Sequence, residues 1–523
     1  MNDTAILPSY LVGSWQSGTG DGAEVKDAVT GETVCRVSSA GLDIAAAVEH
    51  ARTVGAPALA ALTFHERAGI VKQLALALSE RKAELYELSA RAGATARDAG
   101  VDVDGGFGTA LVFSSLARKG LPDATVVAED EFIGLGKEGS FGGRHLLTTP
   151  RGGVAVQINA FNFPVWGMLE KLAPALIAGV PNIVKPATPT AYIAQRAVEI
   201  MLESGALPEG ALQLVCGSIP GLFDQLGGQD HVGFTGSAAT AARLRGDAAV
   251  TQRSLHLNVE ADSLNASVLG PDATPDSPEF GLFVKGLVTE MTVKAGQKCT
   301  AIRRALVPAA QLEAVTEAAS AALGKVVVGA PGAEGVRMGA LVGTEQRDDV
   351  RAAADRLAAA GRLVFGDPQQ VAVVGADADR GAFLSPLLIS ADPQQVAPHE
   401  VEAFGPVSTL LPYADPADVV PILARGQGSL AGSVVSHDPD FVREVVLGAA
   451  SHHGRILVLD RDCAAESTGH GIPMPQLVHG GPGRAGGGEE EGGLRAVHAH
   501  LHRTAVQGSP TALAMLAGED VPA

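Results

Sequence analysis

Residues 182–234 read NIVKPATPTAYIAQRAVEIMLESGALPEGALQLVCGSIPGLFDQLGGQDHVGF, in which short apolar runs are separated by longer mixed segments. The runs at 182–185, 212–215 and 231–234 have the length and composition of buried strands. Residues 192–204 repeat apolar positions at three- and four-residue steps, as an amphipathic helix does. Strands that alternate with helices at this spacing form parallel βαβ units. The segment therefore predicts an α/β fold built on a doubly wound parallel sheet.

The regions on both sides of this segment have their own patterns. Residues 42–92 show long helical periodicity, and 144–158 read as a hairpin of two short strands around a Pro/Gly turn. A second region of alternating strands and helices covers 263–459, with helices expected near 312–323 and 347–360. A chain of 523 residues is long enough for two or three structural units.

The composition argues against several classes of function. The formal net charge of −19 disfavours nucleic acid or an anionic membrane surface as the partner. The longest uncharged stretch, 152–169, contains polar amides and a proline and would make a poor membrane span. The cysteines are far apart, so neither a disulfide framework nor a metal cluster is expected. Because the N-terminus also lacks a signal-peptide pattern, we expect a cytoplasmic protein.

A candidate nucleophile lies in Gly296-Gln297-Lys298-Cys299-Thr300. A neighbouring cation such as Lys298 lowers the pKa of a thiol, and the thiolate is the form that attacks readily. The alternative is a buried structural cysteine, which behaves as a small apolar residue. The motifs in other parts of the chain distinguish between a nucleophilic and a structural cysteine.

Three further segments carry groups suited to a nucleotide-dependent reaction. Residues 159–164 (NAFNFP) offer side-chain amides that could donate to a developing oxyanion. Lys185 ends an expected strand, where nucleotides bind in open α/β sheets. Residues 234–237 (FTGS) close a strand and open a helix, whose free N–H groups suit a phosphate. Taken singly, each segment has an ordinary alternative as a turn, a solvated charge or a helix cap.

In this order and spacing, and together with Glu402-Ala-Phe404-Gly-Pro, these motifs resemble the aldehyde dehydrogenase superfamily over nearly the whole chain. The resemblance implies that Cys299 attacks an aldehyde to give a thiohemiacetal, whose oxyanion is held by Asn162 and the Cys299 N–H. Hydride transfer to a nicotinamide cofactor then leaves a thioester on Cys299. Hydrolysis of the thioester by an activated water releases a carboxylic acid.

The resemblance also assigns the cofactor site. It implies that Lys185 binds the adenosine ribose or its phosphate, that Gly236 and Ser237 lie along the pyrophosphate, and that Glu402 holds the nicotinamide ribose. The expected cofactor contacts are Lys185, Thr188, Phe234, Gly236, Ser237, Glu402 and Phe404.

The general base departs from the pattern of the superfamily, which usually carries it in a Glu-Leu-Gly-Gly-Lys segment. Residues 257–265 of this chain read LNVEADSLN, and we expect Glu260 to activate the hydrolytic water. Asp262, two residues further on, and Glu290, shortly before the cysteine, are the alternative bases. The ordinary alternative for Glu260 is a solvated or ion-paired loop acid.

A second departure concerns the choice of cofactor. Many NAD-preferring members of the superfamily have a glutamate three residues after the lysine, where it accepts from the ribose 2′-hydroxyl. This chain has Thr188 at that position. Without the carboxylate there is no repulsion against a 2′-phosphate, and the hydroxyl together with Lys185 can hold one. NADP is therefore the expected cofactor, with NAD left open.

Residues 259–265, 296–300 and 475–489 resemble one branch of the superfamily, the ring-opening semialdehyde dehydrogenases of aerobic aromatic degradation through coenzyme A thioesters. Some of these carry an extra hydratase domain, for which a chain ending at Ala523 leaves no room, so the stand-alone type is expected. The resemblance then implies a CoA-linked aldehyde, 3,4-dehydroadipyl-CoA semialdehyde of benzoate degradation, as the substrate. The alternatives are a CoA-acylating aldehyde dehydrogenase, a broad-specificity enzyme for free aldehydes and a non-catalytic binding protein.

The resemblance implies an aldehyde dehydrogenase fold with three parts. A cofactor-binding domain is expected at 1–140 and 156–262, and an α/β catalytic domain at 263–470. A small β oligomerisation flap and C-terminal segment are expected at 141–155 and 471–523. Such a flap implies a homodimer or homotetramer.

Several polar residues near the C-terminus have ordinary interpretations. His498, His500 and His502 alternate, which would place them on one face of a polar strand, and no acidic or cysteine partner is placed to complete a metal site. Arg484, among glycines, could reach a substrate carboxylate or phosphate. The run Glu489–Glu491 is expected to be a solvated turn.

Overall fold

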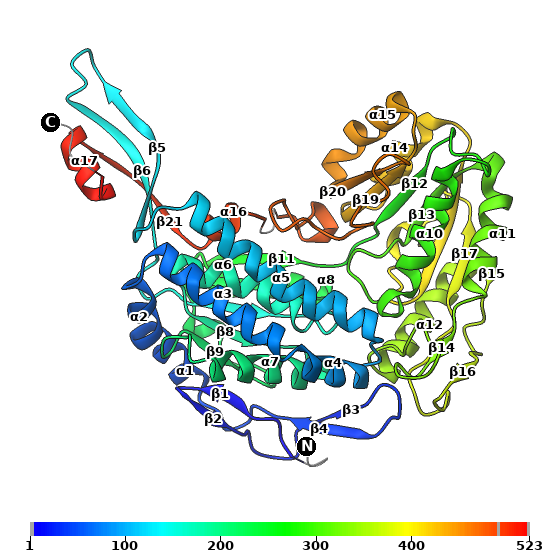
Figure 1. Ribbon diagram of the computed structural model, residues 1–523, viewed down its shortest axis with the longest axis horizontal. Coiled ribbons are helices and arrows are strands. Elements are labelled where there is room, and N and C mark those ends of the chain that lie inside the picture. The colour runs from blue at the N-terminus through cyan, green and yellow to red at the C-terminus, as the bar shows by residue number, and fades with distance from the viewer. Residues whose placement is uncertain (1–4, 489–491, 520–523) are drawn as a thin grey trace.

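The structure is a computed structural model, and it describes residues 5–488 and 492–519. It consists of two large units, each built around a seven-stranded sheet, and a three-stranded sheet that projects from one end (Figure 1). The expected turn at Glu489–Glu491 lies outside the described residues. No helix within the two described ranges is long and apolar enough to cross a membrane.

The first unit contains the parallel sheet predicted from residues 182–234. Its strands, in spatial order, are β11 (His256–Glu260), β10 (His231–Thr235), β7 (Ala155–Ile158), β8 (Asn182–Lys185), β9 (Leu212–Leu214), β1 (Ser9–Leu11) and β2 (Ser14–Gln16). Neighbours from β11 to β9 are parallel, and β1 is antiparallel to β9. The three expected strands are therefore confirmed. The strand order reverses direction between β7 and β10, and such a switch point is where ligands bind in open sheets.

Alternate residues of these strands face two hydrophobic layers, as the two-residue period of a strand requires. Val156, Ile183 and Val232 are register neighbours and pack with α1 (Ile44–His50) on one face. Val184 faces the other side, in a core with α3 (Phe64–Glu80), α5 (Ala96–Gly120), α6 (Trp166–Ala178) and α7 (Ala191–Glu203). Because β7, β8 and β10 are parallel, their carboxyl ends lie along one edge of the sheet. Packing on both faces of the sheet holds these ends in place.

The second unit is the region of alternating strands and helices predicted at 263–459. Its sheet has the order β15 (Gly361–Phe365), β17 (Leu387–Ala391), β18 (Val407–Tyr413), β13 (Arg304–Pro308), β12 (Ala266–Leu269), β19 (Ser429–Val435) and β20 (His453–Leu459). Only β15 runs antiparallel to its neighbour in this sheet. Its helices are α10 (Pro278–Thr292), α11 (Leu312–Leu323), α12 (Thr344–Ala359), α14 (Val419–Ala424) and α15 (Pro439–Ala449). The chain crosses between the sheets at 261–265.

The projecting sheet consists of β21 (His502–Gly508), β6 (Phe141–Thr148) and β5 (Val126–Leu135), beside α17 (Pro510–Ala517). The two strands predicted at 144–158 are present as β6 and β7, but their pairing as a hairpin was wrong. Strand β6 pairs with β5 and β21, while β7 pairs with β8 and β10 in the first sheet. After the Pro/Gly turn the chain enters the first sheet as β7 and does not fold back to pair with β6. Strand β5 thus lies in the projecting sheet, although the sequence placed it within 1–140.

The projecting sheet and α17 expose the apolar side chains of Ile133, Leu135 and Met515. The expected self-association, which stays a prediction, would cover such side chains.

The predicted histidine-bearing strand was wrong for two of its three residues. His498 lies in α16 (Leu494–Ala499) and His500 follows that helix as its C-cap, so only His502 belongs to β21. An alternation carried by three residues cannot distinguish a strand from the end of a helix. The ring of His500 packs against that of His231, with centroids 4.2 Å apart.

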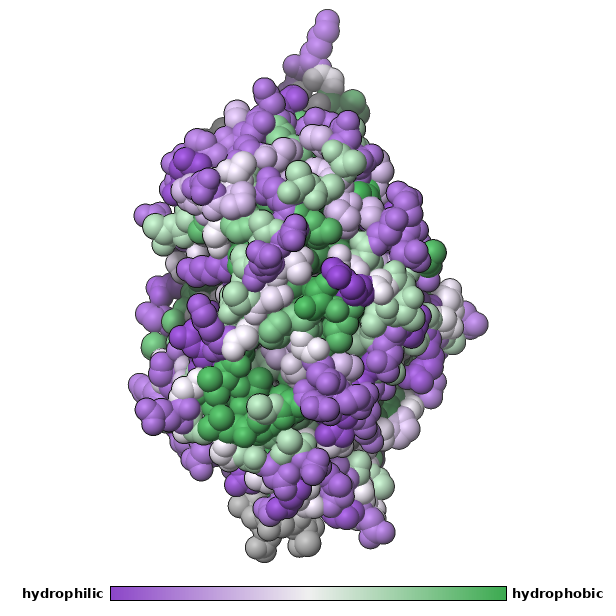
Figure 2. All heavy atoms as spheres, turned by 90° about the vertical axis from the view of Figure 1, so that its right-hand side faces the viewer, coloured by the Kyte–Doolittle hydropathy of each residue, from purple (hydrophilic) through white to green (hydrophobic). Residues whose placement is uncertain are grey.

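The shorter elements complete the surface of both units. They are β3 (Ala23–Lys26), β4 (Thr33–Val37), β14 (Val328–Gly329), β16 (Val373–Val374), α2 (Ala56–Ala60), α4 (Lys82–Arg91), α8 (Ala238–Arg245), α9 (Ala248–Thr251) and α13 (Ala397–Glu400). Figure 2 shows the end of the molecule formed by the second unit, where apolar residues gather in separate patches on a largely hydrophilic surface.

Candidate active site

The turn that carries the cysteine lies between α10 and β13, and its backbone adopts a conformation that requires glycine at one position. Gly296 has a φ of +69°, and a Cβ there would lie 2.2 Å from the carbonyl oxygen of Gly405. Only glycine fits such a position. The Gln297 side chain fastens the turn, since its Oε1 accepts from the Val342 N–H at 3.0 Å. The residues before Cys299 therefore shape the backbone that presents it.

Lys298 does not face the thiol, so the expectation that it lowers the cysteine pKa was wrong. Its buried Nζ lies 2.7 Å from both carboxylate oxygens of Glu290 in α10. Burial, followed by the negative charge of Glu260, raises the pKa of the Cys299 thiol well above its usual value. The resting cysteine is therefore a thiol that needs a base, because the thiol is a far weaker nucleophile than the thiolate.

Glu260 stands where such a base is needed. It is the last residue of β11, its side chain is buried, and it lines the same pocket as Cys299, close enough for its negative charge to raise the pKa of the thiol. Burial raises the pKa of Glu260, but the His479 imidazole, the Lys171 ammonium and the thiol together lower it by more, so the pKa lies below its usual value. Glu260 is thus a carboxylate at neutral pH.

The two alternative bases lie elsewhere. The Asp262 carboxylate accepts from the Ala238 N–H at 2.9 Å, at the start of α8. Glu290 is paired with Lys298. Of the three acids considered from the sequence, Glu260 is the one that lines the pocket of the thiol.

The thiol opens into a pocket between the two units. Among its lining residues are Asn162, Trp166, Glu170, Glu260, Cys299 and His479. The loop that carries Asn162, between β7 and α6, is anchored by Asp102 of α5, whose carboxylate accepts from the Trp166 N–H at 2.8 Å. Because Asn162 is buried and lines the same pocket as Cys299, its amide can donate to an oxyanion formed there.

Buried polar atoms without partners lie at the switch point of the first sheet. Neither amide atom of Asn159, just beyond β7, has a hydrogen-bond partner among the described residues, and the same is true of the Thr235 hydroxyl at the end of β10. Both residues line the Cys299 pocket. A polar group of a bound ligand would satisfy them.

The cofactor residues expected from the sequence lie along the carboxyl edge of this sheet. Lys185 ends β8, and Thr188 lines a cavity together with Gly217 and Ser218 beyond β9. Ser237 is the N-cap of α8, where its hydroxyl accepts from a backbone N–H of the first turn. This edge therefore offers a lysine, a hydroxyl and a helix N-terminus to an elongated anionic ligand.

The turn between β10 and α8 shows why small residues follow the strand. A Cβ on Gly236 would lie 2.6 Å from the Phe234 ring, so glycine lets that ring fold back under the turn. Arg484 lies near Asp262 at 4.0 Å, and its guanidinium donates to two backbone carbonyls of α13. Its role in the structure is to join the loop after β20 to the second unit.

Glu402 and Phe404 extend from the second unit toward this edge. Phe404 packs edge-on against Phe161, with centroids 5.8 Å apart, beside the loop that carries Asn162. Oε1 of Glu402 is buried without a hydrogen-bond partner in the described part of the chain. Burial raises the pKa of Glu402 to about 7, although Arg303 opposes the rise. A ribose hydroxyl is a donor that would satisfy this carboxylate.

We expect cofactor binding to weaken as the pH falls through about 7, the pKa of Glu402. The ionised carboxylate accepts stronger hydrogen bonds than the neutral acid, so the contribution is present above this pKa and lost below it. The cofactor Kd should rise about tenfold from pH 8 to pH 6, as measured by titration calorimetry. Glu402→Gln should bind more weakly at pH 8 and lose this pH dependence. An equally steep profile in the variant would assign the effect to another group.

Sequence reasoning missed Glu170 and His479. Glu170 stands beside Lys171 in the otherwise apolar helix α6, and two charges in such a helix were the available signal, because buried charges require partners. His479 lies in a glycine-rich loop without periodicity and reaches the pocket only through the tertiary fold.

Three features define the class of the protein: the two α/β units, a half-buried cysteine that shares its pocket with a carboxylate, and a sheet edge suited to a nucleotide. The sequence profile of the aldehyde dehydrogenase family matches residues 15–501, and the chain belongs to this family. The predicted fold and the predicted class of enzyme are therefore confirmed.

Two individual proteins are similar to the chain in sequence. The 3,4-dehydroadipyl-CoA semialdehyde dehydrogenase of Aromatoleum evansii is 48% identical over 479 residues, which cover 91% of this chain and 93% of that protein. Protein MaoC of Klebsiella aerogenes is 52% identical over 184 residues, 34% of this chain and 52% of that protein.

Solved structures share the fold at lower identity. Betaine aldehyde dehydrogenase of Staphylococcus aureus, in complex with NAD+, has a TM-score of 0.83 at 22% identity and covers 97% of both chains. PnpE of Pseudomonas sp. WBC-3 has a TM-score of 0.82 at 23% identity and covers 96% of this chain and 98% of its own.

Proposed function

We propose that the protein oxidises its aldehyde through a covalent intermediate on Cys299, with Glu260 as the base in both half-reactions. As the sulfur attacks the carbonyl carbon, the thiol proton passes to Glu260 and the Asn162 amide donates to the oxyanion. Loss of hydride turns the thiohemiacetal into a thioester, and Glu260 takes a proton from the water that attacks it. The shared pocket carries this proposal, because Glu260, Cys299 and Asn162 all line it and can therefore act on one carbonyl group.

We propose a nicotinamide dinucleotide as the cofactor, which supplies the hydride acceptor when bound. The unpartnered polar atoms of Asn159, Thr235 and Glu402 and the capped start of α8 fit such a ligand. NADP is the preferred form, because Thr188 places a hydroxyl where a carboxylate would repel the 2′-phosphate.

We further propose a coenzyme A-linked semialdehyde as the substrate, of the kind for which the 48%-identical relative is named. A second cavity shares Lys298 and Ile472 with the Cys299 pocket. The exposed cations Arg97 of α5 and Lys285 of α10 line this cavity. Arginine and lysine in a cavity that adjoins the reacting pocket suit the phosphates of coenzyme A.

Cofactor reduction tests these proposals directly. A CoA-linked six-carbon semialdehyde is compared with matched free aldehydes, each with NADP and with NAD. A large preference in kcat/KM for the CoA-linked compound with NADP supports both the substrate and the cofactor. Equal or better rates with free aldehydes would remove the coenzyme A proposal and leave the dehydrogenase chemistry standing.

The double variant Arg97→Gln/Lys285→Gln should raise KM for the CoA-linked substrate about tenfold, because two cation–phosphate contacts of roughly 0.7 kcal/mol each are lost. KM for a small free aldehyde should not change. Lys72→Gln is the matched control, since this exposed lysine of α3 lines neither cavity. An equal rise in KM for both substrates would place coenzyme A elsewhere.

A further inference from the structure

Two separate segments present the groups that react in the Cys299 pocket. The nucleophile turn, residues 293–299, carries Cys299, and the amide loop, residues 159–165, carries Asn162. Residues of both segments, among them Asn162 and Lys294, line a further cavity. Because this cavity separates the two segments, direct packing alone does not fix the distance between the thiol and the amide. Another part of the fold has to set it.

Helix α5 binds both segments through two buried aspartates. Asp98 and Asp102 are each 1% exposed and lie four residues apart, so both side chains project from one face of the helix, about 6 Å apart along its axis. Oδ1 of Asp98 accepts from the Lys294 N–H in the nucleophile turn at 2.8 Å. Oδ1 of Asp102 accepts from the N–H groups of Val165 and Trp166 at 3.3 and 2.8 Å, where the amide loop ends. One helix therefore holds both segments.

Both aspartates are themselves well fixed. Oδ2 of Asp98 accepts from the N–H and the hydroxyl of Thr95 at 3.0 and 2.8 Å, in the first turn of α5. Val165 is the N-cap of α6, and its apolar side chain cannot accept from the first turn of that helix. Asp102 supplies the missing acceptor from α5, and its negative charge suits a helix N-terminus. Loss of this carboxylate would release the end of the amide loop.

Lys294 connects the two segments directly. Its backbone lies in the left-handed region, with a φ of +54°, and that of Ala295 follows at +50°. This conformation is uncommon for residues other than glycine, and the bond to Asp98 helps to hold it. The Lys294 ammonium lies 4.8 Å from the centroid of the Phe163 ring in the amide loop. Burial raises the pKa of Asp102, and the same ammonium is the main charge that opposes the rise. The lysine thus joins the turn to the loop by a cation–π contact and by attraction to Asp102.

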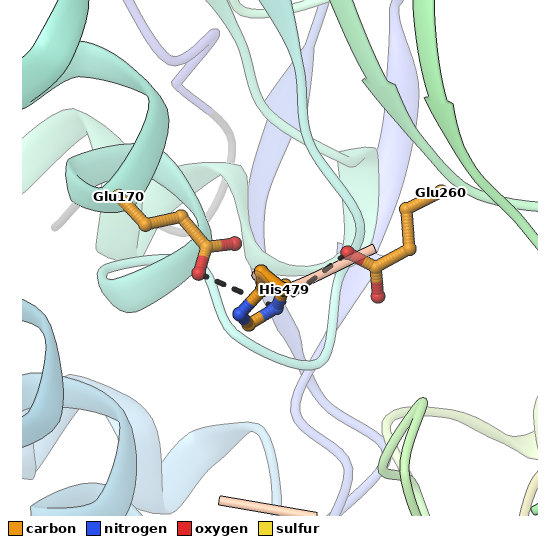
Figure 3. Close-up of side chains that lie close together, drawn as sticks. All are labelled: Glu170, Glu260 and His479. Atoms are coloured by element: carbon orange, nitrogen blue, oxygen red, sulfur yellow. Dashed lines mark ion pairs between the residues drawn. The ribbon is translucent and has the colours of Figure 1, made fainter. Parts of the chain in front are cut away.

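Helix α6, which follows the amide loop, is held by other contacts. Its apolar side chains are buried in the core of the first unit. Further along the helix, Glu170 points toward His479, which lies between it and Glu260 (Figure 3). Nε2 of His479 lies 3.6 Å from Oε2 of Glu170 and 3.8 Å from Oε2 of Glu260. Loss of Asp102 should therefore displace the amide loop and leave α6 in place.

We propose that α5 sets the distance between Asn162 and Cys299, and that Asp102 and Lys294 are positioning residues for the oxyanion donor. The inference rests on the proposed roles of Cys299 as the nucleophile and Asn162 as the donor. A donor has to lie about 3 Å from the position that the oxygen takes in the transition state, and a displacement of about 1 Å can slow a reaction about 100-fold. Asp98 holds one segment and Asp102 the other, so the spacing is fixed before the aldehyde binds.

The test is a double-mutant cycle between Asp102→Ala and Asn162→Ala, in which kcat/KM for the aldehyde is measured. Asp102→Ala should lower kcat/KM about 100-fold, and Asp102→Asn, which keeps an acceptor oxygen, should restore most of this loss. In the Asn162→Ala background, Asp102→Ala should change kcat/KM by less than about threefold, because no amide is left to position. Asp104→Ala is the matched control and should keep full activity, since it removes a carboxylate of the same helix that pairs with Lys82 at the surface.

Lys294→Asn tests the proposal independently of Asp102. Asparagine adopts the left-handed backbone more readily than lysine and keeps the N–H that Asp98 accepts, so the nucleophile turn should fold normally. Loss of the ammonium should lower kcat/KM roughly tenfold, and again only while Asn162 is present. A cofactor Kd within about twofold of that of the unaltered protein shows that each variant is folded.

The other outcomes overturn the proposal in distinguishable ways. Equal losses of kcat/KM with and without Asn162 would show that Asp102 and Lys294 act on the fold at large and position no donor. Unchanged kcat/KM in Asp102→Ala and Lys294→Asn, together with a large loss in Asn162→Ala, would remove the positioning role and leave the donor standing. Full activity of Asn162→Ala would remove the oxyanion donor from the proposed function and this inference with it.

Discussion

Replacing Cys299 with alanine should abolish aldehyde oxidation and reduce kcat by at least about 10⁴-fold. Alanine lacks the sulfur that bonds to the carbonyl carbon, and no other cysteine of the described chain lines the pocket. Cys35 and Cys216 are buried in the first unit, and Cys463 is exposed. Cofactor reduction at saturating aldehyde is the measurement.

Cys463→Ala is the matched control and should keep full activity, because it removes the same atom at an exposed position outside the pocket. Cofactor binding to Cys299→Ala should stay close to that of the unaltered protein, which separates lost chemistry from lost folding. Activity of Cys299→Ala within tenfold of the control would contradict the covalent mechanism.

Features with a local signal could be predicted from the sequence. Strand β8 and helix α11 repeat apolar residues with the period of their own backbone, and their predicted bounds agree with the structure. The turn before Cys299 also has a local signal. Gly296 adopts a backbone conformation that other residues rarely adopt, so a glycine at this position indicates a turn. Motifs of this kind, each confined to a few neighbouring residues, carry the resemblance to the family.

Features that depend on distant partners could not be predicted in this way. Lys298 adjoins Cys299 in sequence, yet its ammonium turns to Glu290, because adjacency in the chain does not set the direction of a side chain. Strand β6 likewise finds one partner, β21, near the far end of the chain. The cluster of Glu170, Glu260 and His479 has the same origin, since the chain brings its members from three separate segments.

Replacing Glu260 with glutamine should give an enzyme that reduces about one cofactor per site and then stalls. The amide cannot take a proton from water, so the thioester on Cys299 should persist and kcat should fall about 10²- to 10⁴-fold. Stopped-flow absorbance measures the single turnover, and mass spectrometry of the quenched protein detects the acyl group on Cys299. The single turnover should itself be slower, because the thiol has lost the carboxylate that would accept its proton in the same pocket.

The same substitution should make Cys299 easier to alkylate in the absence of substrate. Burial raises the pKa of this thiol, and the Glu260 carboxylate raises it further. Removing the negative charge lowers the pKa, so at a fixed neutral pH more thiolate is present and iodoacetamide should react faster. Asp262→Asn, which alters a carboxylate bound to the start of α8, should leave the alkylation rate unchanged.

Steady turnover by Glu260→Gln would assign the base to another carboxylate, and slower alkylation would contradict the electrostatic effect of Glu260 on the thiol. Faster alkylation with slower turnover in one variant separates the two effects of this carboxylate, because a folding defect that exposes the thiol would not preserve a stoichiometric single turnover.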